Sequence, residues 1–215
     1  MSDTTQYKWD EKRKAMVAIL QHHYGIRDVR VLKAMEKVRR HVFIPLEHCQ
    51  GLDPYGDYPC PIGYGQTISQ PYIVAYMTER LNLKEGENVL EVGTGCGYQS
   101  AILAELGAKV LSIEIIPELA EHSKKILEQE GYSDKVTVVT ADAYRYPYDR
   151  KFDAIICTCA PPNIPSVLVE QMNDPGRMIL PVGVWEQYLV FVTKEKGKIR
   201  EEKDIAVRFV PMVQK

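Results

Sequence analysis

The chain has 215 residues, of which 45% are hydrophobic and 26% are charged, and its formal net charge is −2 at pH 7. This composition is typical of a globular protein with a substantial core, and it excludes the disordered and fibrous classes. So small a net charge provides no overall attraction to nucleic acid or to an anionic membrane. No apolar stretch is long enough to span a bilayer, and residues 1–14 lack the apolar centre of a signal peptide. Five scattered cysteines without a CxxC pair indicate reduced thiols and a cytoplasmic protein.

The N-terminal part of the chain has helical spacing of its apolar residues over 9–24 and 27–40, with Gly25 between them as a C-cap. Prolines and glycines then accumulate over 45–65, which predicts a long loop of the kind that often binds a ligand. A helical pattern returns between Thr67 and Leu83, after Pro71. We interpret the basic residues of the second helix as a solvated face; they are Lys33, Lys37, Arg39 and Arg40.

From residue 87 onward, short apolar strands alternate with amphipathic helices. The predicted strands are 88–92, 109–114, 135–140, 152–158 and 177–182, and the predicted helices are 98–106, 117–130 and 165–172. Such alternation predicts an α/β fold with a doubly wound, mostly parallel sheet. Leu189–Thr193 and Ile205–Val210 are strand-like with no helix between them, which predicts an antiparallel C-terminal pair. We expect one domain, with residues 1–65 as a helical extension and substrate-side loop packed on a core of residues 66–215.

A glycine-rich turn, Gly93-x-Gly95-x-Gly97, follows the first strand of the core and precedes a helix. Glycines are needed there because the backbone must turn tightly and approach a ligand where a Cβ would collide. The spacing is GxGxG rather than the GxGxxG of dinucleotide enzymes, and no phosphate-binding lysine follows. The pattern therefore disfavours a pyrophosphate or a nucleoside triphosphate.

An acidic residue stands near the end of each of three successive strands: Glu91, Glu114 and Asp142. In an open α/β sheet, ligands bind beyond the carboxyl ends of the strands. There Glu114 can accept hydrogen bonds from both ribose hydroxyls, and Asp142 lies within reach of an adenine edge. We predict an adenosine-type cofactor at this edge, and we include the neighbouring Thr94, Ile115 and Ala143 in the site.

Several segments resemble the protein-L-isoaspartate O-methyltransferases, a family of class I S-adenosylmethionine-dependent methyltransferases. The most specific is Gly65-Gln66-Thr67-Ile68-Ser69-Gln70-Pro71; the others are Arg39–Pro45, Arg177–Gly183 and Val207–Met212. The resemblance implies a Rossmann-like methyltransferase sheet. It also implies methyl transfer from S-adenosyl-L-methionine to the α-carboxylate of L-isoaspartyl residues in damaged proteins or peptides, initiating their repair. S-adenosyl-L-homocysteine is then the product.

The same resemblance assigns roles to the residues of the specific string. Ser69 matches the family's active-site serine, whose hydroxyl would orient the accepting carboxylate, and Gln66, Thr67 and Ile68 would lie over the cofactor. An alternative from the sequence is that Ser69 caps the following helix. A carboxylate is already ionised at neutral pH, so the transfer requires no general base and depends on proximity and alignment. We expect no metal, because the histidines show no ligand spacing; they are His22, His23, His41, His48 and His122.

Three segments depart from the family pattern. Ala141-Asp142-Ala143 replaces Gly-Asp-Gly, Thr158–Pro162 replaces a run richer in alanine, and Asn173–Gly176 replaces Lys-Pro-Gly-Gly. These changes leave two alternatives open: a methyltransferase for another acceptor, such as a small carboxylic acid or RNA, and an inactive cofactor-binding relative. The expected partners are isoaspartyl proteins and peptides, with neither nucleic acid nor membrane. The sequence does not specify the oligomeric state, and a monomer is the default expectation.

Overall fold

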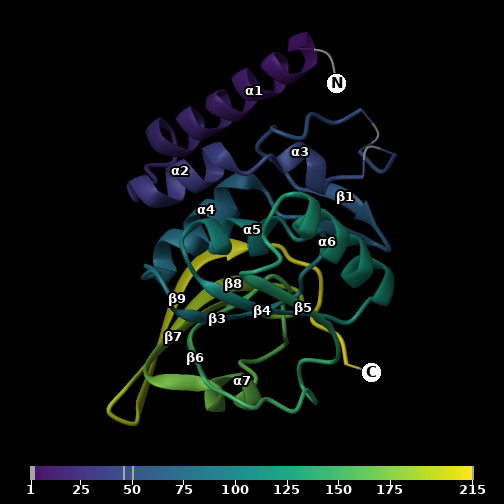
Figure 1. Cartoon of the computed structure of the whole chain (residues 1–215). Helices are drawn as coiled ribbons and strands as arrows, with labels where there is room; N and C mark the ends of the chain where they lie inside the picture. Colours follow the sequence, from purple (N-terminus) through teal and green to yellow (C-terminus); the bar gives the residue numbers. More distant parts are fainter. Residues whose placement is uncertain (1–2, 46, 50, 215) are drawn as a thin grey trace.

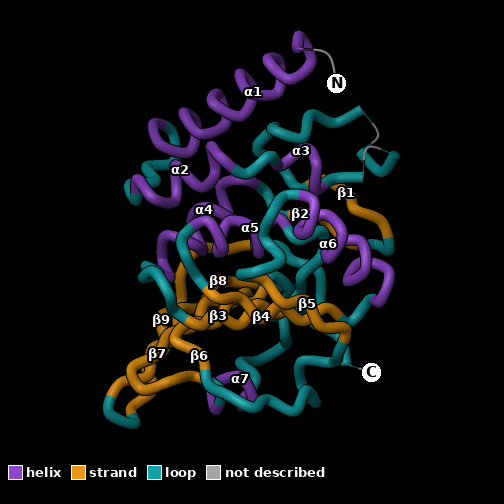
Figure 2. Tube along the Cα trace, viewed as in Figure 1, coloured by secondary structure: helices purple, strands orange, loops and turns teal. Residues whose placement is uncertain are grey.

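A seven-stranded sheet with helices on both faces forms the body of the protein (Figures 1 and 2). The computed structural model describes residues 3–45, 47–49 and 51–214. The parallel strands are β3 (Asn88–Val92), β4 (Lys109–Glu114), β5 (Val136–Thr140), β6 (Phe152–Cys157) and β7 (Met172–Val182). The antiparallel strands β8 (Gln187–Glu195) and β9 (Lys198–Val207) complete the sheet. The predicted fold class is confirmed.

The strand order is β5-β4-β3-β6-β7-β8-β9. The strands β4 and β5 lie on one side of β3 and the strands β6 to β9 on the other, so the order in which the chain adds strands reverses at β3. In doubly wound sheets, ligands bind at this switch point, beyond the carboxyl ends of the strands. The glycine turn directly follows β3 and therefore lies at the switch point.

The helices divide unequally between the two faces of the sheet (Figure 2). One face carries α4 (Pro71–Leu81), α5 (Tyr98–Glu105) and α6 (Pro117–Gln129), whereas α7 (Ser166–Glu170) lies on the other. Because strand side chains alternate between faces, Val89 joins the larger hydrophobic core and Leu90 the smaller one. No helix in the described part of the chain combines the length and apolar character needed to cross a bilayer.

The N-terminal extension consists of α1 (Asp3–His22), α2 (Val29–Lys37) and α3 (Arg40–Phe43), which lie beyond α4 (Figure 1). The predicted second helix is interrupted after Lys37, and this break turns Arg40 inward. Arg40 is fully buried; its Nε donates to the Pro54 carbonyl at 2.7 Å, and its guanidinium lies 5.1 Å from the Tyr98 ring centroid. The interpretation of this basic cluster as a solvated face is therefore wrong for Arg40.

Two short strands lie where only a loop and a helix were expected. β1 (Cys60–Gly63) pairs antiparallel with β2 (Gln66–Ile68) through the tight turn at Tyr64 and Gly65. The expected boundary between residues 65 and 66 falls inside this hairpin. The hairpin carries Gln66, Thr67 and Ile68 towards the carboxyl edge of the main sheet.

Pairing also moves the ends of several core elements. β7 begins at Met172 rather than 177, because Met172 pairs with Phe152 at the start of β6. As a result α7 ends at Glu170, and residues 173–176, one of the departures from the family pattern, lie within the strand. β9 begins at Lys198 rather than 205, because its first residue pairs with Glu195 across the hairpin.

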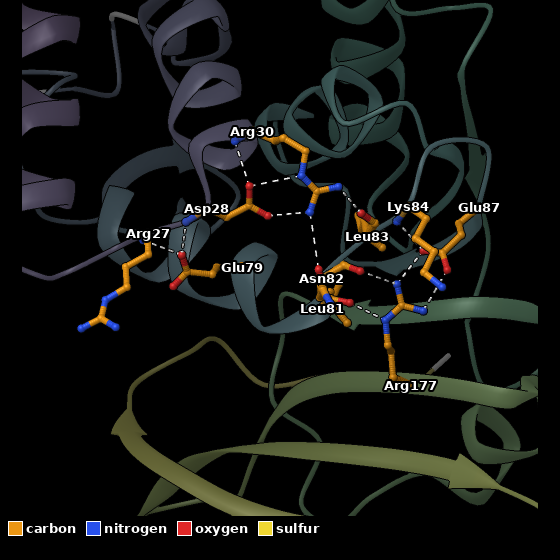
Figure 3. Close-up of polar contacts among 10 residues, drawn as sticks. All are labelled: Arg27, Asp28, Arg30, Glu79, Leu81, Asn82, Leu83, Lys84, Glu87 and Arg177. Atoms are coloured by element: carbon orange, nitrogen blue, oxygen red, sulfur yellow. Dashed lines mark hydrogen bonds and ion pairs between the residues drawn. The ribbon is translucent and has the colours of Figure 1, made fainter.

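Two arginines connect the carboxyl end of α4 to the rest of the protein (Figure 3). Arg177 on β7 donates to the carbonyls of Leu81, Asn82 and Asp153. It also forms an ion pair with Glu87, in which Nη2 lies 2.5 Å from Oε2. Arg30 on α2 donates to the Leu83 carbonyl at 2.7 Å. The bond to the Leu81 carbonyl satisfies one of the groups that the end of α4 leaves without an intrahelical partner.

Candidate functional site: a cofactor cavity joined to a second cavity

The glycine turn is packed directly against the end of β6. Gly93 has φ of +95°, and a Cβ there would lie 2.5 Å from Oγ1 of Thr158. The same hydroxyl donates to the Gly93 carbonyl at 2.5 Å. Gly97, with φ of +90°, is the N-cap of α5. The turn therefore requires glycine at these two positions, as the sequence predicts for a close approach.

A cavity of about 960 Å³, counting the space open to solvent, lies beside this turn. The predicted site residues that line it are Gln66, Thr67, Ile68, Ser69, Gly93, Thr94, Gly95, Glu114, Ile115 and Ala143. Residues predicted from the strand ends and residues assigned by resemblance thus meet at one cavity. Glu91, Gly97 and Asp142 are not among the described residues that line it.

Glu114 lies at the end of β4 with its carboxylate fixed by two backbone amides. Gly95 N donates to Oε2 at 2.8 Å and Ile116 N donates to Oε1 at 3.0 Å. A carboxylate oxygen can accept more than one hydrogen bond, so both oxygens retain capacity for a ligand diol. Glu114 is 5% exposed and lines the cavity, which suits the predicted contact with ribose.

Glu91 lies beneath the glycine turn rather than in the cavity. Its Oε2 accepts hydrogen bonds from Ser100 on α5 and from Ser112 on β4, the latter at 2.7 Å. The residue is fully buried, and burial raises the pKa of its carboxyl to about 7. Among the described residues, Oε1 has no hydrogen-bond partner. The arrangement suits a role in shaping the turn better than direct contact with a cofactor.

Asp142 and Ala143 follow β5 at the same edge of the sheet. Asp142 accepts a hydrogen bond from Tyr144 N at 2.9 Å, and its side chain is 8% exposed. Ala143 is 5% exposed; it lines the cavity and belongs to the smaller hydrophobic core. Its methyl group, the first departure from the family pattern, is therefore accommodated by packing.

Ser69 stands at the junction of two cavities. A second cavity, of about 970 Å³ including open space, shares Thr67, Ser69, Thr158 and Val210 with the first. The alternative that Ser69 caps the next helix is wrong: within the described chain, α4 has Gln70 as its N-cap and no side-chain capping hydrogen bond. Ser69 thus lines both the cavity beside the glycine turn and a second cavity.

Sequence reasoning missed part of the cavity wall. Cys159 and residues 210–213 also line the first cavity. A parallel bridge between Ala160 and Pro211 brings this C-terminal segment to the site. An isolated bridge between residues so far apart in the sequence cannot be predicted from a local sequence pattern. Burial raises the pKa of the Cys159 thiol to about 12, so the thiol stays protonated and weakly nucleophilic at neutral pH.

Comparison with known proteins now identifies the family. The model of the family Protein-L-isoaspartate(D-aspartate) O-methyltransferase (PCMT) matches residues 11–215. Protein-L-isoaspartate O-methyltransferase 2 of Archaeoglobus fulgidus is 46% identical over 209 residues, covering 95% of this chain and 94% of that protein. The corresponding protein of Dictyoglomus turgidum is 47% identical over 212 residues, covering 98% and 94%. This chain belongs to the protein-L-isoaspartate O-methyltransferase family.

A crystal structure of a β-aspartate methyltransferase (PCMT) from Plasmodium falciparum, in complex with S-adenosyl-L-homocysteine, has the same architecture. Its TM-score to this chain is 0.83 with 26% sequence identity, covering 94% of this chain and 98% of that one. The predicted resemblance, enzyme class and cofactor class are confirmed. The family string that contains Ser69 lines the first cavity, with Gln66, Thr67, Ile68 and Ser69 in its wall.

Proposed function

We propose that this chain transfers the methyl group of S-adenosylmethionine to the α-carboxylate of L-isoaspartyl residues in damaged proteins and peptides. One observation carries the proposal beyond family membership: Ser69 lines both the cofactor cavity and the second cavity. A methyl group can pass only between reactants that meet at such a junction. The second cavity is therefore the place for the acceptor.

The residues of the first cavity fit the cofactor. Gly93 and Gly95 line the cavity with backbone alone, and the carboxylate of Glu114 is held to accept a diol. Gln66, Thr67 and Ile68 would cover the bound cofactor from the β1–β2 hairpin. When bound, S-adenosylmethionine supplies an electrophilic methyl group on a sulfonium sulfur.

The second cavity fits a carboxylate acceptor. Among the residues that the structure describes, its lining contains Arg208 and no acidic residue, so the formal charge of this described lining is positive. The isoaspartyl α-carboxylate is ionised at neutral pH. One of its oxygens forms the new O–CH₃ bond as the S–CH₃ bond breaks, giving a methyl ester and S-adenosylhomocysteine. No proton has to be moved.

The residues of the chain then act by positioning the acceptor and the cofactor, and not as a general acid or base. The Ser69 hydroxyl would donate to the non-reacting carboxylate oxygen and align the other with the methyl group. Thr158, which also lines both cavities, donates a hydrogen bond to the Gly93 carbonyl and keeps the turn fixed. Holding two reactants in line is a large source of rate acceleration in such transfers.

We place this activity in the cytoplasm, on the support of the free thiols Cys49, Cys60, Cys96, Cys157 and Cys159. Thiols persist in reducing compartments. Damaged proteins of that compartment are the proposed partners, and no role for nucleic acid is proposed.

The position of the new ester tests the acceptor. A peptide that carries one isoaspartyl residue, one glutamyl residue and a free C-terminal carboxylate is incubated with enzyme and cofactor, and the product is mapped by tandem mass spectrometry. We expect a single ester, on the isoaspartyl α-carboxylate. Esters on the glutamyl or terminal carboxylate would favour a general carboxyl methyltransferase instead.

A further inference from the structure

The turn between β7 and β8, residues 183–186, exposes two large apolar side chains. Trp185 is 96% exposed and Val184 is 65% exposed, and Trp185 has the highest exposure of the large hydrophobic residues that the structure describes. Aromatic side chains in water are typical of surfaces that bind other molecules, where tryptophan often supplies much of the affinity. The position of this turn indicates what it binds.

The turn is held against the loop that follows β6. β7 runs parallel to β6, with Ile179 opposite Ile156, so β7 ends at the same edge as Thr158. Gly183 N donates to the Pro161 carbonyl at 3.0 Å. The exposed turn therefore lies at the edge of the sheet that carries the two cavities.

The turn is also held against the wall of the acceptor cavity. Gln187, the first residue of β8, donates from Nε2 to the Phe209 carbonyl at 3.1 Å and accepts from Phe209 N at 2.6 Å. Phe209 and the following Val210 line the second cavity. Trp185 thus lies two residues before Gln187, whose side chain is hydrogen-bonded to the backbone of Phe209 in the cavity wall.

The backbone of the turn leaves Gly183 no freedom to carry a side chain. Its φ is +130°, and a Cβ there would lie 2.0 Å from the Glu186 carbonyl oxygen. A turn this tight fixes the backbone on which Val184 and Trp185 stand. A tryptophan on such a backbone loses little conformational entropy when it binds, because it has only two side-chain torsions.

Other exposed apolar residues lie on the adjoining segments. Val213 is 49% exposed, and Pro162 is exposed. Met212 N donates to the Ala160 carbonyl at 2.8 Å, which holds the C-terminal segment against the same loop that Gly183 contacts. We call the exposed residues of these three segments the apolar rim; they are Pro162, Val184, Trp185 and Val213.

We propose that the apolar rim binds aliphatic or aromatic side chains that flank the acceptor residue in an unfolded segment of the substrate protein. The proposal rests on the proposed function, because the rim adjoins the cavity assigned to the acceptor. The described lining of that cavity contains Arg208 and no acidic residue, so the cavity takes a carboxylate, while the rim takes apolar groups. An unfolded segment presents both together, since folded proteins bury most large apolar side chains.

Tryptophan fluorescence tests the contact without any turnover. The chain has two tryptophans, so Trp9→Phe leaves Trp185 as the reporter and keeps an aromatic ring where Trp9 stacks on His41 at 4.8 Å. This variant is titrated, with S-adenosylhomocysteine present, with isoaspartyl peptides whose flanking residues are leucine and phenylalanine or are serine. We expect a blue shift of the emission with the apolar flanks and none with serine. Equal emission with both peptides would overturn the proposal. A blue shift caused by raising the protein concentration alone would also overturn it, because it would show that a second copy of the chain binds the apolar rim.

Kinetics separate this proposal from the proposed function. In Trp185→Ser, we expect KM for the apolar-flanked peptide to rise about tenfold, with kcat and the KM of the serine-flanked peptide unchanged. Tyr7→Ser, which removes a 68% exposed aromatic side chain from α1, is the matched control. It should leave KM and kcat unchanged for both peptides. An equal KM in wild type and Trp185→Ser for both peptides would contradict the rim. Absence of methyl transfer to every peptide, with the fluorescence shift retained, would instead contradict the proposed function alone.

Discussion

Ser112 donates a hydrogen bond of 2.7 Å to the buried carboxyl of Glu91. The hydroxyls of Ser112 and Thr94 are 2.6 Å apart, and because Ser112 has already used its single proton, Thr94 is the donor of this second bond. Thr94 belongs to the glycine turn and lines the cofactor cavity. A chain of hydrogen bonds therefore runs from the acid beneath the turn to the turn itself.

The burial of Glu91 predicts a pH dependence of stability. Its folded-state pKa, about 7, lies above the model value of 4.5, so the folded protein binds more protons than the unfolded chain between these values. Stability should therefore fall as pH rises from about 4.5 to 7, by about 3 kcal/mol at most for this one group. Glutamine resembles the neutral carboxyl, so Glu91→Gln should remove this part of the slope.

Urea unfolding of wild type and Glu91→Gln between pH 5 and 8 measures the difference. The Ser100 and Ser112 hydroxyls donate hydrogen bonds to the carboxyl, and the Glu114 carboxylate and the Cys96 thiol interact with it electrostatically. Parallel pH profiles for the two proteins would show that Glu91 does not titrate in this range.

Glu114 should carry a substantial part of the cofactor affinity. In Glu114→Ala, the amides of Gly95 and Ile116 lose their acceptor, and the cofactor diol loses its partner. Hydrogen bonds to a charged group are worth about 1.5–3 kcal/mol, so the Kd for S-adenosylhomocysteine should rise about 10- to 100-fold. Isothermal titration calorimetry gives the value. Glu118→Ala, at an exposed position on α6, is the control and should bind normally.

Comparison of Glu91 with Glu114 shows where sequence reasoning stops. Both acids stand near strand ends, and both were predicted to bind the cofactor. The register pairs Glu91 with Ser112, which precedes Glu114 by two residues on β4. Glu91 therefore lies on the same face of the sheet as Glu114 but two residues farther from the carboxyl edge. Strand positions are visible in a sequence, whereas the register between strands depends on tertiary packing.

Other parts of the fold likewise divide into features that the sequence predicts and features that depend on tertiary packing. The alternation of strands and helices was sufficient to predict the parallel sheet and its antiparallel end, because each element has its own apolar periodicity. The burial of Arg40 was not predictable, since it depends on a helix break after Lys37 and on the distant Pro54 carbonyl. The β1–β2 hairpin is too short to have a periodic signal.

Ser69→Ala should separate turnover from cofactor binding. Ser69 lines both cavities and is not the N-cap of α4, so loss of its hydroxyl should lower kcat/KM for an isoaspartyl peptide about 10- to 100-fold. The Kd for S-adenosylhomocysteine and the unfolding midpoint should remain close to wild type. Ser166→Ala, at the exposed start of α7, serves as the control. Equal losses of turnover and cofactor affinity would place Ser69 in the cofactor site alone.

Arg177 should be important for stability and not for chemistry. Its side chain is 19% exposed and that of its partner Glu87 is 16% exposed, so Arg177→Met leaves a carboxylate and several carbonyls poorly satisfied. We expect unfolding free energy to fall by about 2–4 kcal/mol in urea titrations. Lys125→Met, which breaks a 3.4 Å pair between exposed side chains, should change it by less than about 1 kcal/mol. Similar effects of the two substitutions would show that the Arg177 network contributes little.

The most direct test of the proposed function compares two peptides that differ in one linkage. Enzyme and methyl-labelled S-adenosylmethionine are incubated with an isoaspartyl peptide or with its normal aspartyl twin, and the labelled ester is counted. We predict rapid labelling of the isoaspartyl peptide and background labelling of the twin. Comparable labelling of both peptides, or of neither, would contradict the proposed function.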